Sequence, residues 1–367
     1  MLKLLIVFAA SLVLAYISEQ NTNAIVASGR RYSVWNDWAY LLLVTILILF
    51  TGLRTNYNDT WNYMAFYQTA PTISEFFSDV NNLNPFTNPL YYLYESFLKT
   101  FGYDAQVLIF TTAVVTQIGL VFFIKRYSTN FVFSIFIYFT LGTFVCTLAA
   151  IKQVVAMSIA VFAFPYLEQG KWGRFYLIIL IAALFHTYAI AFAVLPLFII
   201  KPWRGFTFIF LAITAVLMMN FEEAITEFME KANDLGKTLA DYEVFDDNTI
   251  NIFRLAVYAV PPIVSLAFQM WIFKDSTKAD NILIHMSIIS LAFMSMGTQS
   301  GANMFARMAM YFELGTICCL PSMLEKTFDK RSYRLVSIIA AVCFFAFFVY
   351  ANAIAGNFGQ EYKWIFG

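Results

Sequence analysis

Residues 53–63 read Leu-Arg-Thr-Asn-Tyr-Asn-Asp-Thr-Trp-Asn-Tyr and follow directly on an apolar run, Trp38–Gly52. They place one arginine, one aspartate, three asparagines and three aromatic rings at the end of a hydrophobic segment. Tryptophan and tyrosine are enriched where a membrane meets water. We predict that this stretch lies at a membrane–water boundary, on the external side, and that it forms part of a binding site.

The composition is typical of polytopic membrane proteins. The chain has 367 residues, of which 60% are hydrophobic and 13% are charged, whereas soluble domains are about 45–50% apolar and about 25% charged. The formal net charge is zero, so no charge imbalance suggests a nucleic-acid partner. The four cysteines lie inside apolar runs, and we interpret them as small buried hydrophobic residues rather than as disulfide or metal ligands.

Apolar runs along the chain are candidate membrane spans, because a helix needs about 20 apolar residues to cross about 30 Å of hydrocarbon. The candidate spans are 2–17, 35–52, 105–124, 131–149, 154–167, 175–185, 187–200, 206–220, 252–273, 282–297, 304–320 and 335–351. We therefore predict an all-α polytopic membrane protein with about 12 transmembrane helices. No internal repeat is visible, so residues 1–367 are treated as a single transmembrane domain whose first span is retained.

Basic residues predict the orientation of these spans, because cytoplasmic loops carry an excess of lysine and arginine. Six short connections hold 14 of the 23 basic residues. These residues are Arg30 and Arg31; Lys125 and Arg126; Lys171 and Arg174; Lys201 and Arg204; Lys274 and Lys278; and Lys326, Lys330, Arg331 and Arg334. With these connections in the cytoplasm, both termini lie outside, together with a long aromatic outer loop at 53–104 and an acidic outer loop at 221–251.

His186 interrupts an uncharged run, 175–200, at a point where two hydroxyl side chains follow it. One long helix through this run would invert the orientation of every later span. We favour a broken pair of short helices that meet at His186, because this arrangement keeps all six basic connections on one side. Each half would be about 18 Å long at about 1.5 Å per residue. The turn would then lie below the outer surface, in a recess that protein or water shields.

Several ionisable residues near the outer ends of the predicted helices lie outside the basic connections. They are Arg54, Asp59, Lys152, His186, Arg254 and Arg307. Charged groups at membrane depth are costly, so they usually face a cavity or a partner. Several cations together with one carboxylate and one histidine suggest an anion site with acid–base chemistry beside it.

Most of these residues also have a structural explanation, which the sequence leaves open. Arg54 and Arg254 could anchor at lipid headgroups by extending toward the interface. Lys152 could cap the tight turn in which it lies. Asp59 could cap the helix that begins after it, since aspartate is a common N-cap residue.

The two histidines are interpreted differently. His285 lies near the cytoplasmic end of its predicted span, and we interpret it as a satisfied core residue. His186 is a candidate for function because it lies at the predicted helix break. Glu313 lies about two turns deeper than Arg307 and needs a partner, so we expect a structural role for it. No metal-ligand spacing is visible, and no metal or cofactor is expected.

Three pieces of the chain resemble the Wzy/EpsG-type polysaccharide polymerases of bacterial cell envelopes. The first is Gly-Leu-Arg at 52–54, followed by Asp-Thr-Trp-Asn-Tyr at 59–63. The second begins with Lys-Gln-Val-Val-Ala at 152–156 and ends with Ala-Leu-Phe-His-Thr at 183–187. The third is Phe-Ala-Arg-Met-Ala-Met-Tyr-Phe at 305–312. Together these pieces extend over most of the chain.

The resemblance implies a metal-independent glycosyltransferase with a GT-C-like fold, which polymerises oligosaccharide repeats carried on undecaprenyl pyrophosphate. It implies a location in the bacterial cytoplasmic membrane, among membrane lipids, with the active site at the outer face. A flippase and a chain-length regulator are the expected protein partners. The catalytic candidates are then Asp59 and His186. The expected substrate-binding residues are Arg54, Lys152, Gln153, Arg254, Arg307 and Tyr311.

In the expected mechanism, the cations hold the pyrophosphate while Asp59 or His186 removes the proton of the acceptor hydroxyl. Two other functions remain open at this point. A flippase or transporter for a lipid-linked saccharide would use the same cations for its pyrophosphate. An O-antigen ligase or an acyltransferase is the other alternative, but acyl transfer would need a histidine paired with a second acidic group, and no such motif is visible.

Overall fold

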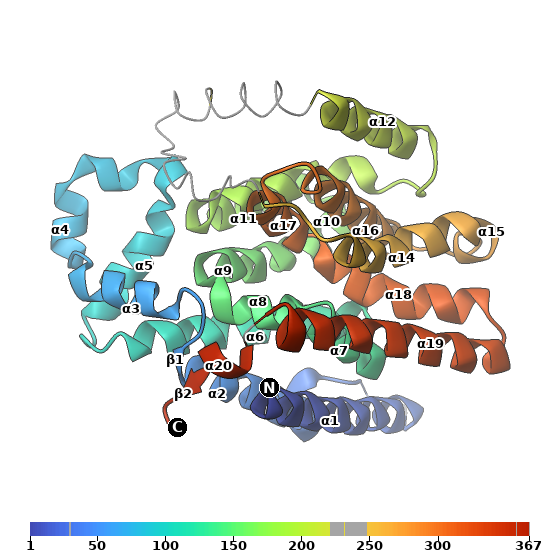
Figure 1. Cartoon of the computed structure of the whole chain (residues 1–367), viewed down its shortest axis with the longest axis horizontal. Helices are drawn as coiled ribbons and strands as arrows, with labels where there is room; N and C mark the ends of the chain where they lie inside the picture. The colour runs from blue at the N-terminus through green and yellow to red at the C-terminus, as the bar shows by residue number, and fades with distance from the viewer. Residues whose placement is uncertain (29–30, 221–230, 232–247, 357, 367) are drawn as a thin grey trace.

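The chain folds into a bundle of roughly aligned helices, seen from the side in Figure 1. The computed structural model describes residues 1–28, 31–220, 231, 248–356 and 358–366. Helices form nearly all of its secondary structure, which confirms the predicted all-α class. Most of the acidic outer loop predicted at 221–251 lies outside the described residues.

Long apolar helices alternate with short ones in the first half of the chain. Its first elements are α1 (Leu2–Ala27), η1 (Val34–Asn36), α2 (Trp38–Gly52), β1 (Arg54–Asn56), α3 (Thr60–Thr69), α4 (Ile73–Ser78), η2 (Val80–Leu83), η3 (Pro85–Thr87), α5 (Pro89–Lys99) and α6 (Gln106–Tyr127). The chain continues through α7 (Phe131–Thr140), α8 (Thr143–Ala149), α9 (Ile151–Ala160), η4 (Val161–Ala163), α10 (Phe164–Glu168) and α11 (Trp172–Phe185).

The second half begins with a long 3₁₀ helix and ends in a short strand. Its elements are η5 (Thr187–Phe198), α12 (Gly205–Met219), α14 (Ile252–Ala267), α15 (Gln269–Ile272), α16 (Lys278–Met296), α17 (Ala302–Met310), α18 (Glu313–Thr327), α19 (Lys330–Val349), the π-helix η7 (Tyr350–Ile354), α20 (Phe358–Glu361) and β2 (Lys363–Trp364). Helix α16 packs against α14, α17 and α18, and most of its residues are buried.

Each predicted span coincides with one helix or with consecutive helices of the bundle. Five of the described helices are long and apolar enough to cross a membrane alone, and a sixth span results if α7 and α8 count as one bent helix. Shorter apolar helices, such as α2, α11 and α14, account for other predicted spans. The chain is therefore a multi-pass membrane protein, while the number of about 12 spans stays a prediction.

The bend between α7 and α8 has a local cause. The two helices meet at an angle of 52°, and Gly142 between them has a φ of 97°. Glycine adopts this left-handed region without the steric cost that a Cβ atom brings. Helix α8 is thereby redirected toward the turn that precedes Lys152.

Contacts between connections group the predicted basic loops at one end of the bundle, which we call the basic end. Lys125 donates to the Ser18 hydroxyl on α1 over 2.8 Å. Lys201 donates to the Phe273 carbonyl over 2.7 Å. Other contacts between these connections are Asn130 with Tyr333, and Lys326 with Asp280. The grouping matches the one predicted from sequence, although which side of the membrane this end faces stays a prediction.

The helix break predicted at His186 is present. Helix α11 ends at Phe185, His186 has an extended backbone with φ −156° and ψ 117°, and η5 begins at Thr187. Helices α11 and η5 pack against each other, as the two arms of a hairpin do and as one continuous helix cannot. Helix η5 is a 3₁₀ helix of 12 residues, so at about 2.0 Å per residue it is longer than the α-helix we expected.

Two segments far apart in sequence meet beside the stretch 53–63. Strand β1 pairs antiparallel with β2, so that Arg54 lies opposite Trp364. The Asn56 side chain donates to the Glu361 carbonyl over 2.8 Å, and Gly359 lies against Met1. Figure 1 shows N and C near each other, beside α20 and β2. The quoted stretch, the start of α1 and the β2 tail therefore share one end of the bundle, opposite the basic end.

Candidate active site

His186 is held at the helix break by a tyrosine from another part of the chain. Its Nδ1 lies 3.0 Å from the hydroxyl of Tyr311, at the junction of α17 and α18. The Tyr188 ring stands edge-on to the imidazole, with ring centroids 5.0 Å apart. Tyr311 is fully buried. Its hydroxyl faces the imidazole, and the substrate contact expected for it from sequence stays a prediction.

The long outer loop is fastened to the same break by Asn88. The Asn88 side-chain oxygen accepts hydrogen bonds from the Thr187 backbone N–H over 3.0 Å and from the Thr187 hydroxyl over 3.1 Å. Asn88 has a φ of 58°, a left-handed conformation that asparagine tolerates better than most residues. Pro89 then begins α5, in the first helical position where proline is favoured. Helix α5 is thus fixed against the turn that carries His186.

Lys152 lies in an aromatic cradle formed by α5. Its Nζ donates to the Tyr92 hydroxyl over 2.9 Å. The same atom lies 4.8 Å from the ring centroid of Tyr91 and 4.3 Å from that of Tyr92. Lys152 is in the first turn of α9, where the helix dipole is unfavourable for a cation. The two rings offset this cost through cation–π attraction.

Glu95 lies beside this cradle and was missed by the sequence reasoning. The side chain is buried, with 2% of its surface exposed. Burial raises the pKa of its carboxyl to about 7, while the positive charge of Lys152 and the nearby Tyr91 hydroxyl oppose the rise. Glu95 was missed because residues 53–104 were treated as one loop. The Asn-Pro pair before an aromatic run, with Pro89 at a helix start, was a signal that could have found α5.

Gln153 links α9 to the segment that carries Arg307 and Tyr311. Gln153 is buried, and its side-chain amide donates to the backbone carbonyl of Arg307. Arg307 precedes Tyr311 by about one helical turn. Among the residues that the structure describes, no hydrogen bond or ion pair engages the Arg307 guanidinium. Gln153, which follows Lys152, contacts the Arg307 backbone, and Tyr311, one turn after Arg307, contacts His186. The segments that carry Lys152, Arg307 and His186 are therefore linked.

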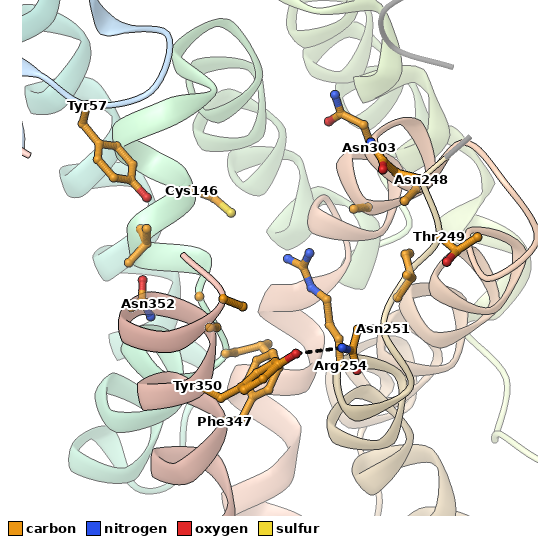
Figure 2. A pocket seen from close by; sticks show the side chains of 18 residues that line it. Tyr57, Cys146, Asn248, Thr249, Asn251, Arg254, Asn303, Phe347, Tyr350 and Asn352 are labelled. Carbon is orange, nitrogen blue, oxygen red and sulfur yellow. Dashed lines mark hydrogen bonds between the residues drawn. The ribbon is translucent and has the colours of Figure 1, made fainter. Parts of the chain in front are cut away.

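Arg254 enters a cavity of about 620 Å³ at the same end of the bundle. Figure 2 shows its guanidinium extending into the cavity, between Cys146 on one side and Asn303 on the other. The Arg254 Nε is buried and has no hydrogen-bond partner. Arg254 and Arg307 both act electrostatically on the Cys146 thiol. Arg254 lines the cavity itself, whereas Arg307 lies on α17, which supplies Asn303 and Ala306 to the lining.

Three cations at this end form no salt bridge within the described part of the chain. They are Lys152, Arg254 and Arg307. All three side chains are partly buried, and removing a cation from water is costly unless a negative charge compensates it. An anionic ligand at this point would remove part of that cost, so the arrangement is suited to binding an anion.

Glu313 has the partners that the sequence could not identify. Its carboxylate accepts a hydrogen bond from Thr143 over 2.6 Å and another from Tyr258. These bonds connect α18 to α8 and α14. Arg254 adds an electrostatic attraction to the same carboxylate. Glu313 is thus satisfied inside the bundle, which agrees with the structural role expected for it.

Arg54 is turned into the protein. Only 1% of its surface is exposed. Its Nε donates to the Thr60 hydroxyl over 3.0 Å, and its Nη1 donates to the Thr51 carbonyl. These bonds connect the end of α2 to the start of α3. The Arg54 Nη2 is buried and has no hydrogen-bond partner, so the contacts present favour a positioning role over direct substrate binding.

Asp59 precedes α3, but its side chain makes no capping hydrogen bond to that helix. The capping explanation that the sequence left open is therefore wrong for this structure. The Asp59 carboxylate acts electrostatically on Tyr63, as do Arg54, Arg307 and Glu95. Tyr63 is thus the point at which the quoted stretch approaches the other candidate residues.

All the residues predicted from sequence as site candidates lie at the end of the bundle opposite the basic end. His186, Tyr311, Arg307, Gln153 and Lys152 form one connected group. Arg254 approaches that group through the cavity, and Arg54 and Asp59 approach it through Tyr63. The cavity asparagines and α5 complete the site, and hydropathy alone gave no indication of either.

The bundle and this site define a multi-pass membrane protein with several cations gathered around one end. Residues 37–365 match the EpsG family, and the chain belongs to that family. The match confirms the resemblance found in the sequence and indicates a glycosyltransferase-like polymerase role in polysaccharide biosynthesis. No curated protein and no solved structure matches the chain.

Proposed function

We propose that this EpsG-family chain polymerises oligosaccharide repeats linked to undecaprenyl pyrophosphate, without a metal, at the outer face of the bacterial cytoplasmic membrane. One observation carries the proposal. Three cations without ion pairs among the described residues converge with an imidazole that is held at a helix break. The GT-C-like character, about 12 spans, and partnership with a flippase and a chain-length regulator belong to the same proposal.

The cations supply the chemistry that a pyrophosphate leaving group needs. Arg254 extends into the cavity, Arg307 lies on α17 beside it, and the Gln153 side chain next to Lys152 binds the Arg307 carbonyl. Hydrogen bonds from charged donors to phosphate are about twice as strong as neutral ones. These bonds would lower the activation barrier, because negative charge develops on the pyrophosphate as its bond to the anomeric carbon breaks.

His186 is suited to removing the proton of the acceptor hydroxyl. Its Nδ1 faces the Tyr311 oxygen. If Nδ1 carries the proton and donates it to Tyr311, Nε2 is the unprotonated nitrogen and can act as the base. The hydrogen bond at one ring nitrogen thereby decides which of the two nitrogens carries the proton. Asp59, beside Tyr63, is the alternative base.

The proposed reaction is a single displacement. The acceptor hydroxyl gives its proton to His186 and its oxygen bonds to the anomeric carbon of the donor sugar. The bond from that carbon to the pyrophosphate oxygen breaks, and undecaprenyl pyrophosphate leaves with both electrons. The product is a chain longer by one repeat, with inverted configuration at the new linkage.

Reconstitution of the purified chain with lipid-linked repeats tests this function. We expect a ladder of products that differ by one repeat, which His186→Ala abolishes. Asp59→Asn then distinguishes the two candidate bases. If Asp59 is the base, this variant loses the pH dependence of the rate, and if His186 is the base, the variant keeps it. Movement of the lipid-linked saccharide across the bilayer without chain growth would instead establish a flippase. Retained anomeric configuration would reject the single displacement.

A further inference from the structure

The cavity that Arg254 enters has an unusual lining for the interior of a membrane protein. Four asparagine side chains line it, together with the hydroxyl-bearing residues Thr249, Tyr57 and Tyr350. The asparagines are Asn248, Asn251, Asn303 and Asn352. Figure 2 shows these asparagines on both sides of the cavity, around the tip of Arg254. Among the described lining residues, Arg254 is the charged one.

Amides in this arrangement are suited to neutral polar ligands. An asparagine side chain carries two N–H donors and a carbonyl acceptor, which complement hydroxyl and acetamido groups. Asn251 and Asn352 each use one amide hydrogen within the protein, to the Tyr350 hydroxyl and the Phe348 carbonyl. The aromatic rings of Tyr57 and Tyr350 present apolar faces beside them. The Asn251 side chain donates to the Tyr350 hydroxyl over 2.9 Å, so this part of the rim is fixed before any ligand arrives. Gly142 also lines the cavity, with open space where a Cβ atom would lie.

The position of the cavity indicates which part of the substrate would bind there. Arg254 has a buried Nε without a partner and acts on Cys146 together with Arg307. A pyrophosphate held by Arg254 would therefore place its attached sugar among the asparagines. The cavity volume of 620 Å³ falls within the range of about 300–1,000 Å³ that is typical of small-ligand pockets.

We propose that this asparagine-lined cavity binds the saccharide next to the pyrophosphate of a lipid-linked substrate, through its hydroxyl and acetamido groups. The proposal rests on the proposed function, because it takes the pyrophosphate-linked saccharide as the substrate. It adds that recognition of the sugar, as distinct from the phosphate, is carried by neutral amides from three separate connections. Asn248 and Asn251 precede α14, Asn303 begins α17, and Asn352 belongs to η7.

Cys146 provides a direct measurement of occupancy, because its thiol lines the cavity. In a Cys343→Ser background, which removes the exposed cysteine, the rate of Cys146 labelling by a small thiol reagent is measured. The probes are farnesyl pyrophosphate and farnesyl pyrophosphate linked to N-acetylglucosamine. We expect the sugar-bearing probe to protect Cys146 at a concentration about tenfold lower, as a few hydrogen bonds would give. Equal protection by both probes, or protection by neither, would overturn the proposal.

Asn303→Ala tests the amides themselves. Asn303 is exposed in the cavity, so its truncation should leave folding intact. We expect the variant to lose the tenfold preference for the sugar-bearing probe and to keep its response to farnesyl pyrophosphate. Asn23→Ala, at an exposed asparagine on α1 outside the cavity, is the matched control and should behave as the wild type. A retained preference in Asn303→Ala would contradict the proposed role of that amide.

The two proposals fail in different ways. Protection of Cys146 is measured without turnover, so it does not depend on polymerase activity. Sugar-dependent protection in a chain that never extends lipid-linked repeats would leave the saccharide site standing and reject the polymerase. Chain growth without sugar-dependent protection would keep the polymerase and reject this cavity as its saccharide site.

Discussion

The two ends of the helix bundle treat their positive charges in opposite ways. At the basic end, Lys201 donates to a backbone carbonyl and Lys326 forms an ion pair with Asp280 over 2.9 Å. At the pocket end, Arg254 and Arg307 have no ion-pair partner among the described residues. At the basic end the protein itself engages these cations, and at the pocket end we propose that a ligand does.

The two histidines differ in their burial and in the backbone around them. His285 is fully buried, and its two ring nitrogens face the Thr207 hydroxyl at 2.9 Å and the Asn281 carbonyl at 3.0 Å. His186 is only partly buried and lies where the helix is interrupted. A histidine whose nitrogens are both engaged has a structural role. This confirms the interpretation of His285 made from sequence.

Replacing the two histidines should give the largest difference between the two ends. We expect His186→Ala to lower kcat/KM by about 10²–10⁴-fold, the usual worth of a general base. His285→Ala should lower the thermal midpoint, because it leaves the buried Thr207 hydroxyl without its partner. Turnover per folded molecule should be unchanged in His285→Ala. Chain-growth assays on detergent-purified protein, normalised to the folded fraction, separate the two effects, and equal losses in both variants would remove the contrast.

Replacing arginine at the pocket end should have the next largest effect. We expect Arg254→Ala and Arg307→Ala each to raise KM for the lipid-linked substrate by about 10–100-fold, as lost charge-assisted hydrogen bonds imply. Lys201→Ala is the matched control at the basic end, where the lysine is engaged by the Phe273 carbonyl. Its KM should stay at the wild-type value. Initial-rate kinetics measure all three, and an unchanged KM in both arginine variants would mean that these cations do not bind substrate.

A smaller effect should follow from Tyr311→Phe, which keeps the ring and removes the oxygen facing His186. We expect kcat to fall about tenfold with KM unchanged, because the imidazole loses the partner that orients it. Tyr188→Phe keeps the edge-on ring contact with His186 and serves as the control. A rise in KM without a fall in kcat would instead return Tyr311 to the substrate-binding role first expected for it.

The smallest expected effect concerns Glu95 and appears in stability rather than in rate. Because burial raises the pKa of folded Glu95 from 4.5 to about 7, the folded chain keeps a proton that the unfolded chain loses in that window. Stability from this group therefore falls as the pH rises from 4.5 to about 7. We expect Glu95→Gln to raise the thermal midpoint more at mildly alkaline than at acidic pH.

The control for this measurement is Glu361→Gln, at an exposed glutamate on α20. Its thermal midpoint should follow that of the wild type at every pH. A Glu95→Gln variant with the pH dependence of the wild type would show that this carboxyl ionises in the folded chain as it does in the unfolded one.

The sequence predicted the helices well because hydropathy reports which segments leave water. The runs of apolar residues and the polar interruption at His186 were sufficient to place α11, η5 and the other helices. The basic connections were also predicted to share one side, since charge bias is a property of composition. These features depend on residues close together in the sequence, so one sequence is enough to predict them.

The internal arrangement of the site was not predictable in the same way. The inward rotation of Arg54, the cradle around Lys152 and the burial of Glu95 depend on which neighbours the fold supplies. Hydropathy describes a residue's preference for solvent, not its partner. The asparagines around Arg254 come from separate connections, so no spacing along the chain could have assembled them.

The pairing of β1 with β2 constrains how many times the chain can cross a bilayer. Residues 305 positions apart, Asn56 and Glu361, are joined by a hydrogen bond, so both must emerge from the same leaflet. The crossings between them must then be even in number, because an odd number would separate the two strands by the thickness of the membrane. With the other predicted spans unchanged, the number of crossings is even when α11 and η5 each cross the membrane once. The number is odd when α11 and η5 form one continuous span. A few backbone hydrogen bonds thus check the topology of the whole intervening chain.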